Sequence, residues 1–261
     1  MSSATQNGNA ATVPAAHHQA AEDDTDLRES LAGLSQLTLG STGLAEMLTH
    51  VADFAARAIP GADGAGLTLV HDEAPNTVVA SAEFVREVDA IQYRLGEGPC
   101  VTAALEGRTI RSGSLSGEKA WPRFGPRVGR LGVHSVLSLP LTSAAGIVGA
   151  LNVYAHAKHA FDERASQLGE LFAIPAGISV HTAQQLDKAR RVAGQLQSAL
   201  SSRAVIDQAV GIVMSRSGCA AVEAFDKLRV ISQTEHRKLA DVAQQVVEEA
   251  VRRARARHTG Q

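Results

Sequence analysis

Two cysteines are the side chains of this chain that could act as nucleophiles. Cys100 follows the turn Gly98-Pro99 and opens a helical segment, Val101–Leu105. A cysteine near a helix start can have a lowered pKa and react, yet cysteine is also among the most often buried residue types. Packing is the favoured interpretation. Cys219 is distant in sequence, and neither cysteine has metal-ligand neighbours, so a disulfide framework or a zinc site is not expected.

The histidines do not form a ligand set. His134 precedes a predicted strand, but no second histidine, cysteine or carboxylate follows at ligand spacing, and His156 and His159 flank a charged loop. A phosphate-cradling glycine loop, a nucleophile elbow and a paired-carboxylate arrangement are all missing from the sequence. We therefore expect no catalytic residue, no bound metal and no enzymatic activity.

Six basic residues near the C-terminal end fall off the apolar stripes of predicted helices and so face outward. An exposed basic face attracts phosphates and gives an affinity that depends on salt. The alternative is a solvated face with local pairs to Asp226 and Asp241. The six are Arg203, Arg216, Lys227, Arg229, Arg237 and Lys238.

Three short amphipathic segments between Leu200 and Glu249 carry these basic residues. Gly218 follows the first segment, where a helix C-terminus favours a left-handed backbone. Three helices that cover one another are the smallest way to bury three stripes, so we expect a helical bundle. The stripes are Val205, Ala209, Ile212 and Val213; Val222, Phe225, Leu228 and Ile231; and Leu239, Val242, Ala243, Val246 and Val247.

The same stretch resembles the ANTAR domain, a helical RNA-binding output module of bacterial antitermination regulators. The resemblance implies that the six basic residues contact RNA. Two positions depart from the family pattern: Val210 stands where a lysine is usual, and Ala220 replaces a capping hydroxyl. The matching residues are Arg203, Ile206, Ala209, Gly211, Met214, Glu223, Ala224, Phe225, Leu228, Arg229, Arg237, Lys238, Leu239, Asp241, Val242 and Ala243.

Charge is spread unevenly over the 261 residues. Residues 186–261 hold 13 Lys/Arg and 8 Asp/Glu, whereas the first 185 hold 12 and 19. This asymmetry suggests an acidic front and a back that faces nucleic acid. No apolar run approaches the roughly 20 residues that span a bilayer, and no secretory signal is evident. We expect a cytoplasmic protein without a membrane segment.

The N-terminal part predicts an α+β layout with helices packed on an antiparallel sheet. Residues 1–25 lack a periodic apolar pattern and are predicted to form a disordered tail. Two helices follow, the first closed by Gly40 and the second capped by Ser41-Thr42. Five strands and a closing helix from about Asp162 come next. The strands are predicted at Ala65–Val70, Thr77–Ser81, Thr109–Ser112, Ser135–Leu141 and Gly146–Tyr154.

This part resembles a GAF domain, a small-molecule-sensing module, from about residue 40 to 182. A GAF domain fused to an ANTAR domain is a known arrangement of actinobacterial regulators, which this chain resembles. One enzyme built on the GAF fold reduces free methionine sulfoxide with several cysteines, but here the domain has Cys100 alone. The matching residues are Gly96-Glu97-Gly98-Pro99-Cys100, Trp121-Pro122-Arg123-Phe124, Gly132-Val133-His134-Ser135-Val136, Leu139-Pro140-Leu141 and Gly149-Ala150-Leu151-Asn152-Val153-Tyr154.

The resemblance places four residues near a ligand cavity: Cys100, Trp121, Phe124 and His134. Trp121 and Phe124 fall on the loop-rich middle that walls the cavity, where they either line a small-molecule pocket or fill the core under a long loop. His134 could reach the same cavity. The ligand and any cofactor are not legible from the sequence.

Between the two modules Leu186, Ala189, Ala193, Leu196 and Leu200 recur at spacings of three and four. This spacing is that of a two-heptad coiled-coil seam, which predicts a parallel homodimer. The alternative is one helix that packs on its own sheet. Upstream, Pro175 removes a backbone donor, so a kink or a break is expected near it.

Together these patterns predict a signal-responsive RNA-binding transcription antiterminator, which senses a small molecule and binds stem-loops of nascent RNA as a homodimer. The alternative is a sensor whose helical end binds a protein partner or DNA. The predicted segments are a tail (1–25), a GAF-like sensor domain (26–182), a coiled-coil linker (183–199), an ANTAR domain (200–255) and a second tail (256–261).

Overall fold

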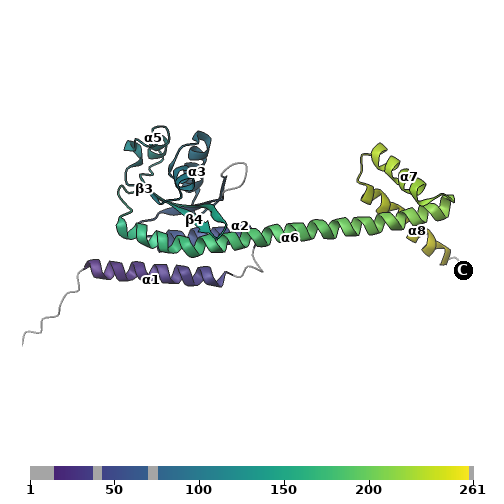
Figure 1. Cartoon of the computed structure of the whole chain (residues 1–261), viewed down its shortest axis with the longest axis horizontal. Helices are drawn as coiled ribbons and strands as arrows, with labels where there is room; N and C mark the ends of the chain where they lie inside the picture. Colours follow the sequence, from purple (N-terminus) through teal and green to yellow (C-terminus); the bar gives the residue numbers. More distant parts are fainter. Residues whose placement is uncertain (1–14, 38–42, 70–75, 259–261) are drawn as a thin grey trace, which may run out of the picture. The chain divides into compact units, whose positions relative to one another are not determined.

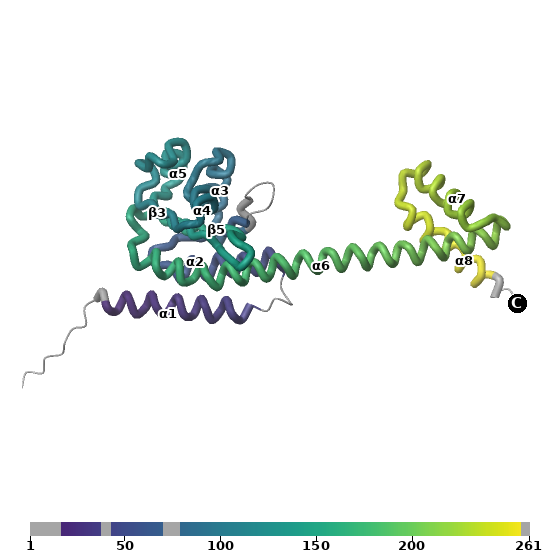
Figure 2. Tube along the Cα trace, viewed as in Figure 1, coloured from purple at the N-terminus to yellow at the C-terminus, as the bar shows by residue number. Residues whose placement is uncertain are grey.

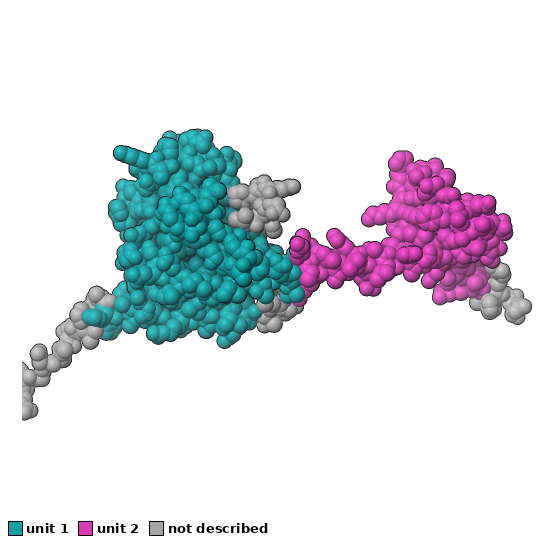
Figure 3. Space-filling view, viewed as in Figure 1, with its two compact units in different colours: residues 1–187 teal, residues 188–261 magenta. Residues whose placement is uncertain are grey.

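The computed structural model describes residues 15–37, 43–69 and 76–258. The chain divides into two compact units, Met1–Asp187 and Lys188–Gln261, and each is described by itself (Figure 3). The elements are α1 (Ala15–Gln36), α2 (Leu44–Ala58), β1 (Gly64–Leu69), β2 (Asn76–Ala80), α3 (Glu83–Leu95), α4 (Pro99–Glu106), β3 (Ile110–Ser112), η1 (Leu115–Gly117), α5 (Phe124–Gly129), β4 (Ser135–Ser143), β5 (Gly146–Ala155), α6 (Glu163–Ser217), α7 (Ala221–Thr234) and α8 (Leu239–His258).

A five-stranded sheet forms the middle of the first unit. Its order is β2-β1-β5-β4-β3, and every neighbouring pair is antiparallel. The predicted α+β fold is confirmed, and each strand lies within two residues of its expected bounds. The connection between β4 and β5 is the expected hairpin, although β4 continues to Ser143, so only Ala144-Ala145 remains between the two strands.

One face of the sheet packs against helices α2 and α6 (Figure 1). Side chains alternate across a strand, so Leu67 and Leu151, which pair across β1 and β5, point to the same side. Leu137 of β4 joins them, and all three are fully buried. Phe172 of α6 and Val51 of α2 close this first core.

The opposite face of the sheet packs against α3 and α5 (Figure 1), and also against α4. Val136 and Tyr154, which pair across β4 and β5, point to this side. They form a second core with Val85 of α3 and Phe124 of α5. The two cores together position the middle strands between two helical layers.

The predicted N-terminal tail is wrong for residues 15–25, because α1 already begins at Ala15. Two polar contacts hold these early turns although they lack an apolar stripe. Gln19 donates to Asp23 at 3.1 Å, and Arg164 pairs with Asp24. The predicted helix end at Gly40 and the predicted cap at Ser41-Thr42 lie outside the described residues. The N-cap of α2 is Gly43, which has no side chain that could cap the helix.

The predicted break near Pro175 does not occur, because α6 runs through this proline as one helix (Figure 2). Proline lacks the N–H that would bond to the carbonyl of Leu171. Leu171 and Ile174 are exposed, so this side of the helix faces solvent and water can bind the freed carbonyl. The helix therefore tolerates the proline.

The predicted linker 183–199 belongs to α6. Ala183, at the start of this stretch, is buried in the first core of the sensor unit. Val192, Leu196 and Leu200 are exposed.

The second unit is the expected three-helix bundle, formed by the end of α6 with α7 and α8. Ala209, Leu228, Val242 and Ala243 form its buried centre. Gly218 ends α6 with a φ of 65°, as predicted. The N-cap of α7 is Ala220, which makes no side-chain cap bond, so this helix start is weakly capped.

Among the described residues no single helix is long and apolar enough to cross a membrane. Taken together, α6 and α7 are long and apolar enough, but the chain bends by 108° at the break between them.

Candidate functional sites

A buried polar cluster lies on the second face of the sheet, under α3 and α4. Most of its members are neutral, and a single carboxylate, that of Asp89, lies among them. Each side chain is at most 1 % exposed. The cluster comprises Thr68 of β1, Asp89 and Gln92 of α3, Cys100 of α4, Ser138 of β4, and Asn152 and Tyr154 of β5.

Asp89 is the centre of this cluster. Its Oδ1 accepts hydrogen bonds from the Tyr154 hydroxyl at 2.5 Å, from Gln92 Nε2 at 2.7 Å and from Asn152 Nδ2 at 3.4 Å. A buried carboxylate needs such donors, because burying it without them is costly. Burial, and then the charge of Asp89, raise the pKa of Tyr154 well above its usual value, so this hydroxyl keeps the proton that it donates.

Cys100 borders the cluster. Its Sγ donates to Thr68 Oγ1 at 3.4 Å, and its backbone N–H donates to Gln92 Oε1 at 3.1 Å. Burial, and then the charge of Asp89, raise the pKa of this thiol to about 11. The thiol is therefore protonated near neutral pH, and its environment favours packing over nucleophilic reactivity.

The other predicted ligand-binding residues lie apart from this hydrogen-bond network. Trp121 and Phe124 are buried in the second core, and the indole N–H of Trp121 donates to Thr102 Oγ1 at 3.0 Å. This placement supports the packing alternative for both aromatics. His134 is partly exposed, and its main chain bonds to Ala155 and Leu115. Of the four, only Cys100 makes hydrogen bonds within the cluster.

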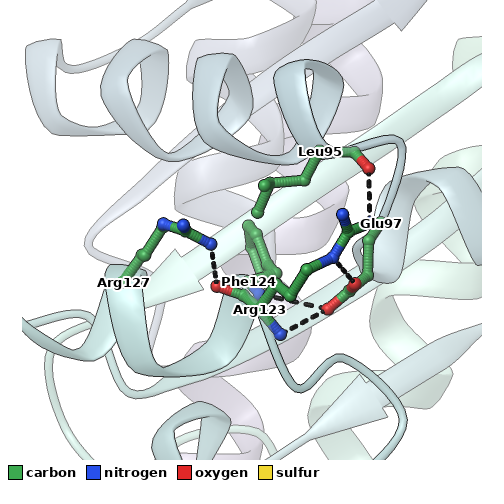
Figure 4. A network of polar contacts seen from close by, with 5 residues as sticks. All are labelled: Leu95, Glu97, Arg123, Phe124 and Arg127. Carbon is green, nitrogen blue, oxygen red and sulfur yellow. Dashed lines mark hydrogen bonds and ion pairs between the residues drawn. The ribbon is translucent and has the colours of Figure 1, made fainter.

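An ion pair between Glu97 and Arg123, with the hydrogen bonds around it, lies at the border of the cluster (Figure 4). Glu97 Oε1 accepts from the backbone N–H of Arg123 at 2.7 Å and of Phe124 at 3.1 Å. Glu97 Oε2 pairs with Arg123 Nε at 2.8 Å, and Arg123 Nη2 donates to the Leu95 carbonyl at 2.8 Å. The hydrogen bond from Arg123 lowers the pKa of Glu97. These contacts connect the loop before Cys100 to the segment that carries Trp121 and Phe124.

Gly98, next to Glu97 in the sequence, allows the loop before α4 to approach Gln92 of α3 closely. A Cβ at this position would lie 2.5 Å from Gln92 Oε1. Any other residue would therefore displace the oxygen that binds the backbone N–H of Cys100.

The sequence interpretation missed most of the polar cluster. A signal for it was present, because a lone polar residue interrupts each of three buried apolar strands: Thr68, Ser138 and Asn152. The register brings these strands together, with Ser138 directly opposite Asn152. Asp89 and Gln92 lie on α3, and no spacing rule links a helix to those strands.

The six basic residues of the second unit are exposed, but they differ in their partners. Arg229 pairs with Asp226 at 2.9 Å. Arg237 pairs with Glu235 at 2.9 Å and also donates to Gln245 at 2.7 Å. Within the part of the chain that the structure describes, four form no ion pair: Arg203, Arg216, Lys227 and Lys238.

These cations do not share one face. Arg203 and Arg216 are thirteen residues apart on α6, so they point about 140° away from one another. Lys227 and Arg229, two residues apart on α7, also point in different directions. The basic surface of the second unit is therefore divided over several sides of the bundle.

The chain thus combines an antiparallel sheet that carries a buried polar cluster with a helical bundle that carries exposed cations. The GAF domain model matches residues 41–181, and the ANTAR domain model matches residues 194–247. The chain therefore belongs to the proteins that combine a GAF domain with an ANTAR domain. Both domains are regulatory, so the chain is a signal-sensing regulator of transcription.

Solved structures resemble the first unit. The GAF domain of a phosphoenolpyruvate-protein phosphotransferase from Coxiella burnetii is 18% identical, with a TM-score of 0.51 over 64% of this chain and 96% of that one. The corresponding domain from Acinetobacter is 14% identical, with a TM-score of 0.50 over 64% and 97%. At these identities the likeness shows the fold alone. No curated protein matches the chain.

Proposed function

We propose that the chain is a transcription antiterminator whose ANTAR domain binds stem-loops of nascent RNA in the cytoplasm. The observation that supports this most is the set of four exposed cations without an ion-pair partner in the described part of the chain. Their charge is available to phosphates. Proteins have little access to the deep groove of A-form RNA, so loop bases and backbone shape are the expected targets. RNA held in this way would not form a competing terminator hairpin.

We further propose that the GAF domain senses a small molecule at the polar cluster. Asp89, Gln92 and Asn152 bring a carboxylate and two carboxamides together at one buried position, where they bond to one another and to their neighbours. Such convergent polar groups in an apolar surround are typical of sites that orient a small ligand. Cys100 contacts this site, whereas Trp121 and Phe124 support its wall from the second core.

A homodimer would place two ANTAR domains side by side. The exposed apolar residues Ile178, Val192, Leu196 and Leu200 lie on one side of α6, because their spacings keep them within about 60° of a common line. A second copy of the chain could cover this side. Two linked RNA sites would then raise the overall affinity through their effective concentration.

An RNA-binding measurement tests the proposal. Full-length protein is titrated with labelled stem-loop RNA from the host's leader sequences and with duplex DNA, at several salt concentrations. The double substitution Lys227→Ala with Lys238→Ala should weaken RNA binding and lower the salt slope by about 1.5 to 2. Lys158→Ala, an exposed lysine of the first unit, is the matched control.

The possible outcomes separate the alternatives. Binding to duplex DNA but not to RNA would favour the DNA-binding alternative, and binding to neither would favour a protein partner. Arg237→Ala with Lys238→Ala should also weaken RNA binding, but it removes the contacts of Arg237 with Glu235 and Gln245 as well. The first pair of lysines is therefore the cleaner test.

An enzymatic GAF domain is disfavoured by the state of its one cysteine. The raised pKa of the Cys100 thiol, about 11, leaves little thiolate at neutral pH, and Cys219 lies in the other unit. Incubation with free methionine sulfoxide should leave this substrate unreduced. Turnover would contradict the proposal.

A further inference from the structure

A groove of about 500 Å³ lies in the second unit between the end of α6 and α8. Its apolar lining includes Ile212 of α6 and Val247 of α8. Polar side chains along α6 border it as well: Gln208, Ser215 and Arg216. All three are exposed, so the groove is open to solvent and offers both an apolar surface and hydrogen-bonding groups.

Gly211 leaves this groove open. A glycine inside a helix is less favourable than alanine, so its presence calls for a reason. In the same helix, Gly177 has one, because a Cβ there would lie 2.4 Å from the Thr142 carbonyl oxygen. At Gly211 nothing lies within 4 Å of such a Cβ. Packing within the chain does not require this glycine, whereas any side chain would project into the groove.

The chemistry of the groove matches that of a nucleobase. A base has two flat apolar faces, which Ile212 and Val247 could contact, and an edge of donors and acceptors. The carboxamide of Gln208 can both donate and accept, as base edges require. Arg216 forms no ion pair with any residue that the structure describes, so its charge is available to the phosphate attached to that base.

We propose that the groove between α6 and α8, opened by Gly211, receives one unstacked base from the loop of the bound RNA hairpin. This inference rests on the proposed RNA-binding function and adds the site at which a loop base is held. Bases of single-stranded loops can be splayed out and taken into such sites, whereas paired bases cannot. The occupant is therefore a loop nucleobase with its phosphate.

Filling the groove tests this proposal. Gly211→Leu places a side chain in the groove and favours the helix. Gly194→Leu is the matched control, because Gly194 is an exposed glycine of the same helix with nothing near its Cβ, and it lies outside the groove. Ser215→Leu, on the groove wall, is a second filling variant if the first does not fold. Each full-length protein is titrated with a leader hairpin and with hairpins in which one loop nucleotide at a time is abasic.

For the wild type, one abasic loop position should weaken binding by between about 5-fold and 150-fold, the range for loss of a stacked base. Gly211→Leu should lose a similar factor on the intact hairpin, and the abasic change should then add little, because both remove the same contact. Gly194→Leu should behave as the wild type.

Three results would overturn the groove proposal while leaving RNA binding itself intact. The first is a Gly211→Leu protein that binds the intact hairpin normally and stays sensitive to the abasic position. The second is an equal loss in Gly194→Leu. The third is a changed oligomeric state of Gly211→Leu in sedimentation, which would make the groove an interface between copies. If the wild type binds no hairpin at all, the proposed function fails instead.

Discussion

Leu196 and Leu200 lie on the exposed side of α6, where they are 60 % and 66 % exposed in the single chain. Fully burying a leucine stabilises by about 1.5–3 kcal/mol. Covering the exposed part of Leu196 in a dimer should therefore contribute about 1–2 kcal/mol per chain, or about 2–4 kcal/mol for two copies. Leu196→Ala should remove most of this and weaken dimerisation by roughly 30-fold to several hundred-fold.

Sedimentation equilibrium over a range of protein concentrations measures the dimer dissociation constant directly. Leu105→Ala is the matched control, since Leu105 is 81 % exposed and belongs to α4 rather than to the exposed apolar side of α6. It should leave the dissociation constant unchanged. A wild-type chain that stays monomeric at micromolar concentrations would refute the reasoning, and so would equal effects of the two substitutions.

Three further outcomes are expected. Ala220→Ser should cap α7 and raise the unfolding free energy of the second unit by about 1 kcal/mol in a denaturant titration. Tyr154→Phe should lower the stability of the first unit by about 1.5–3 kcal/mol, because it removes a buried hydrogen bond to Asp89. A thiol reagent at pH 8 should label Cys219 quickly and Cys100 slowly, and labelling of Cys100 should rise as pH approaches about 11, where its thiolate forms.

Each of these outcomes can fail in a recognisable way. An unchanged denaturant midpoint for Ala220→Ser would mean that the start of α7 is already satisfied. A Tyr154→Phe protein as stable as the wild type would show that Asp89 finds a replacement donor. Rapid labelling of Cys100 in the native protein would contradict its burial, provided that circular dichroism shows the chain to be folded.

Most of the fold could be predicted from local patterns. The five strands are short apolar runs between turn residues, and the end of α6 at Gly218 follows from the left-handed backbone that glycine tolerates. The start of α1 could not be predicted in this way. Its first turns have no apolar stripe, and Asp24 meets Arg164, a partner that lies 140 residues away in the sequence.

The candidate sites were less predictable, because they depend on pairings between distant segments. Cys100 was found from its position before a helix, but its raised pKa arises from burial and from Asp89, which only the fold brings near. The six basic residues could be placed outside the bundle from the apolar stripes. Their ion pairs, such as that of Arg237 with Glu235, and their distribution over several sides were not visible in the spacing.

The closed state of the polar cluster has a kinetic consequence. Because Asp89, Gln92 and Asn152 are shielded from solvent, the small molecule proposed to bind there would reach them only while the protein is transiently open. The observed rate of binding should then level off at high metabolite concentration, where it equals the rate of opening. The association rate constant should stay below the usual 10⁵–10⁷ M⁻¹s⁻¹. Release would be slow for the same reason, so the regulator would keep responding for some time after its signal had disappeared.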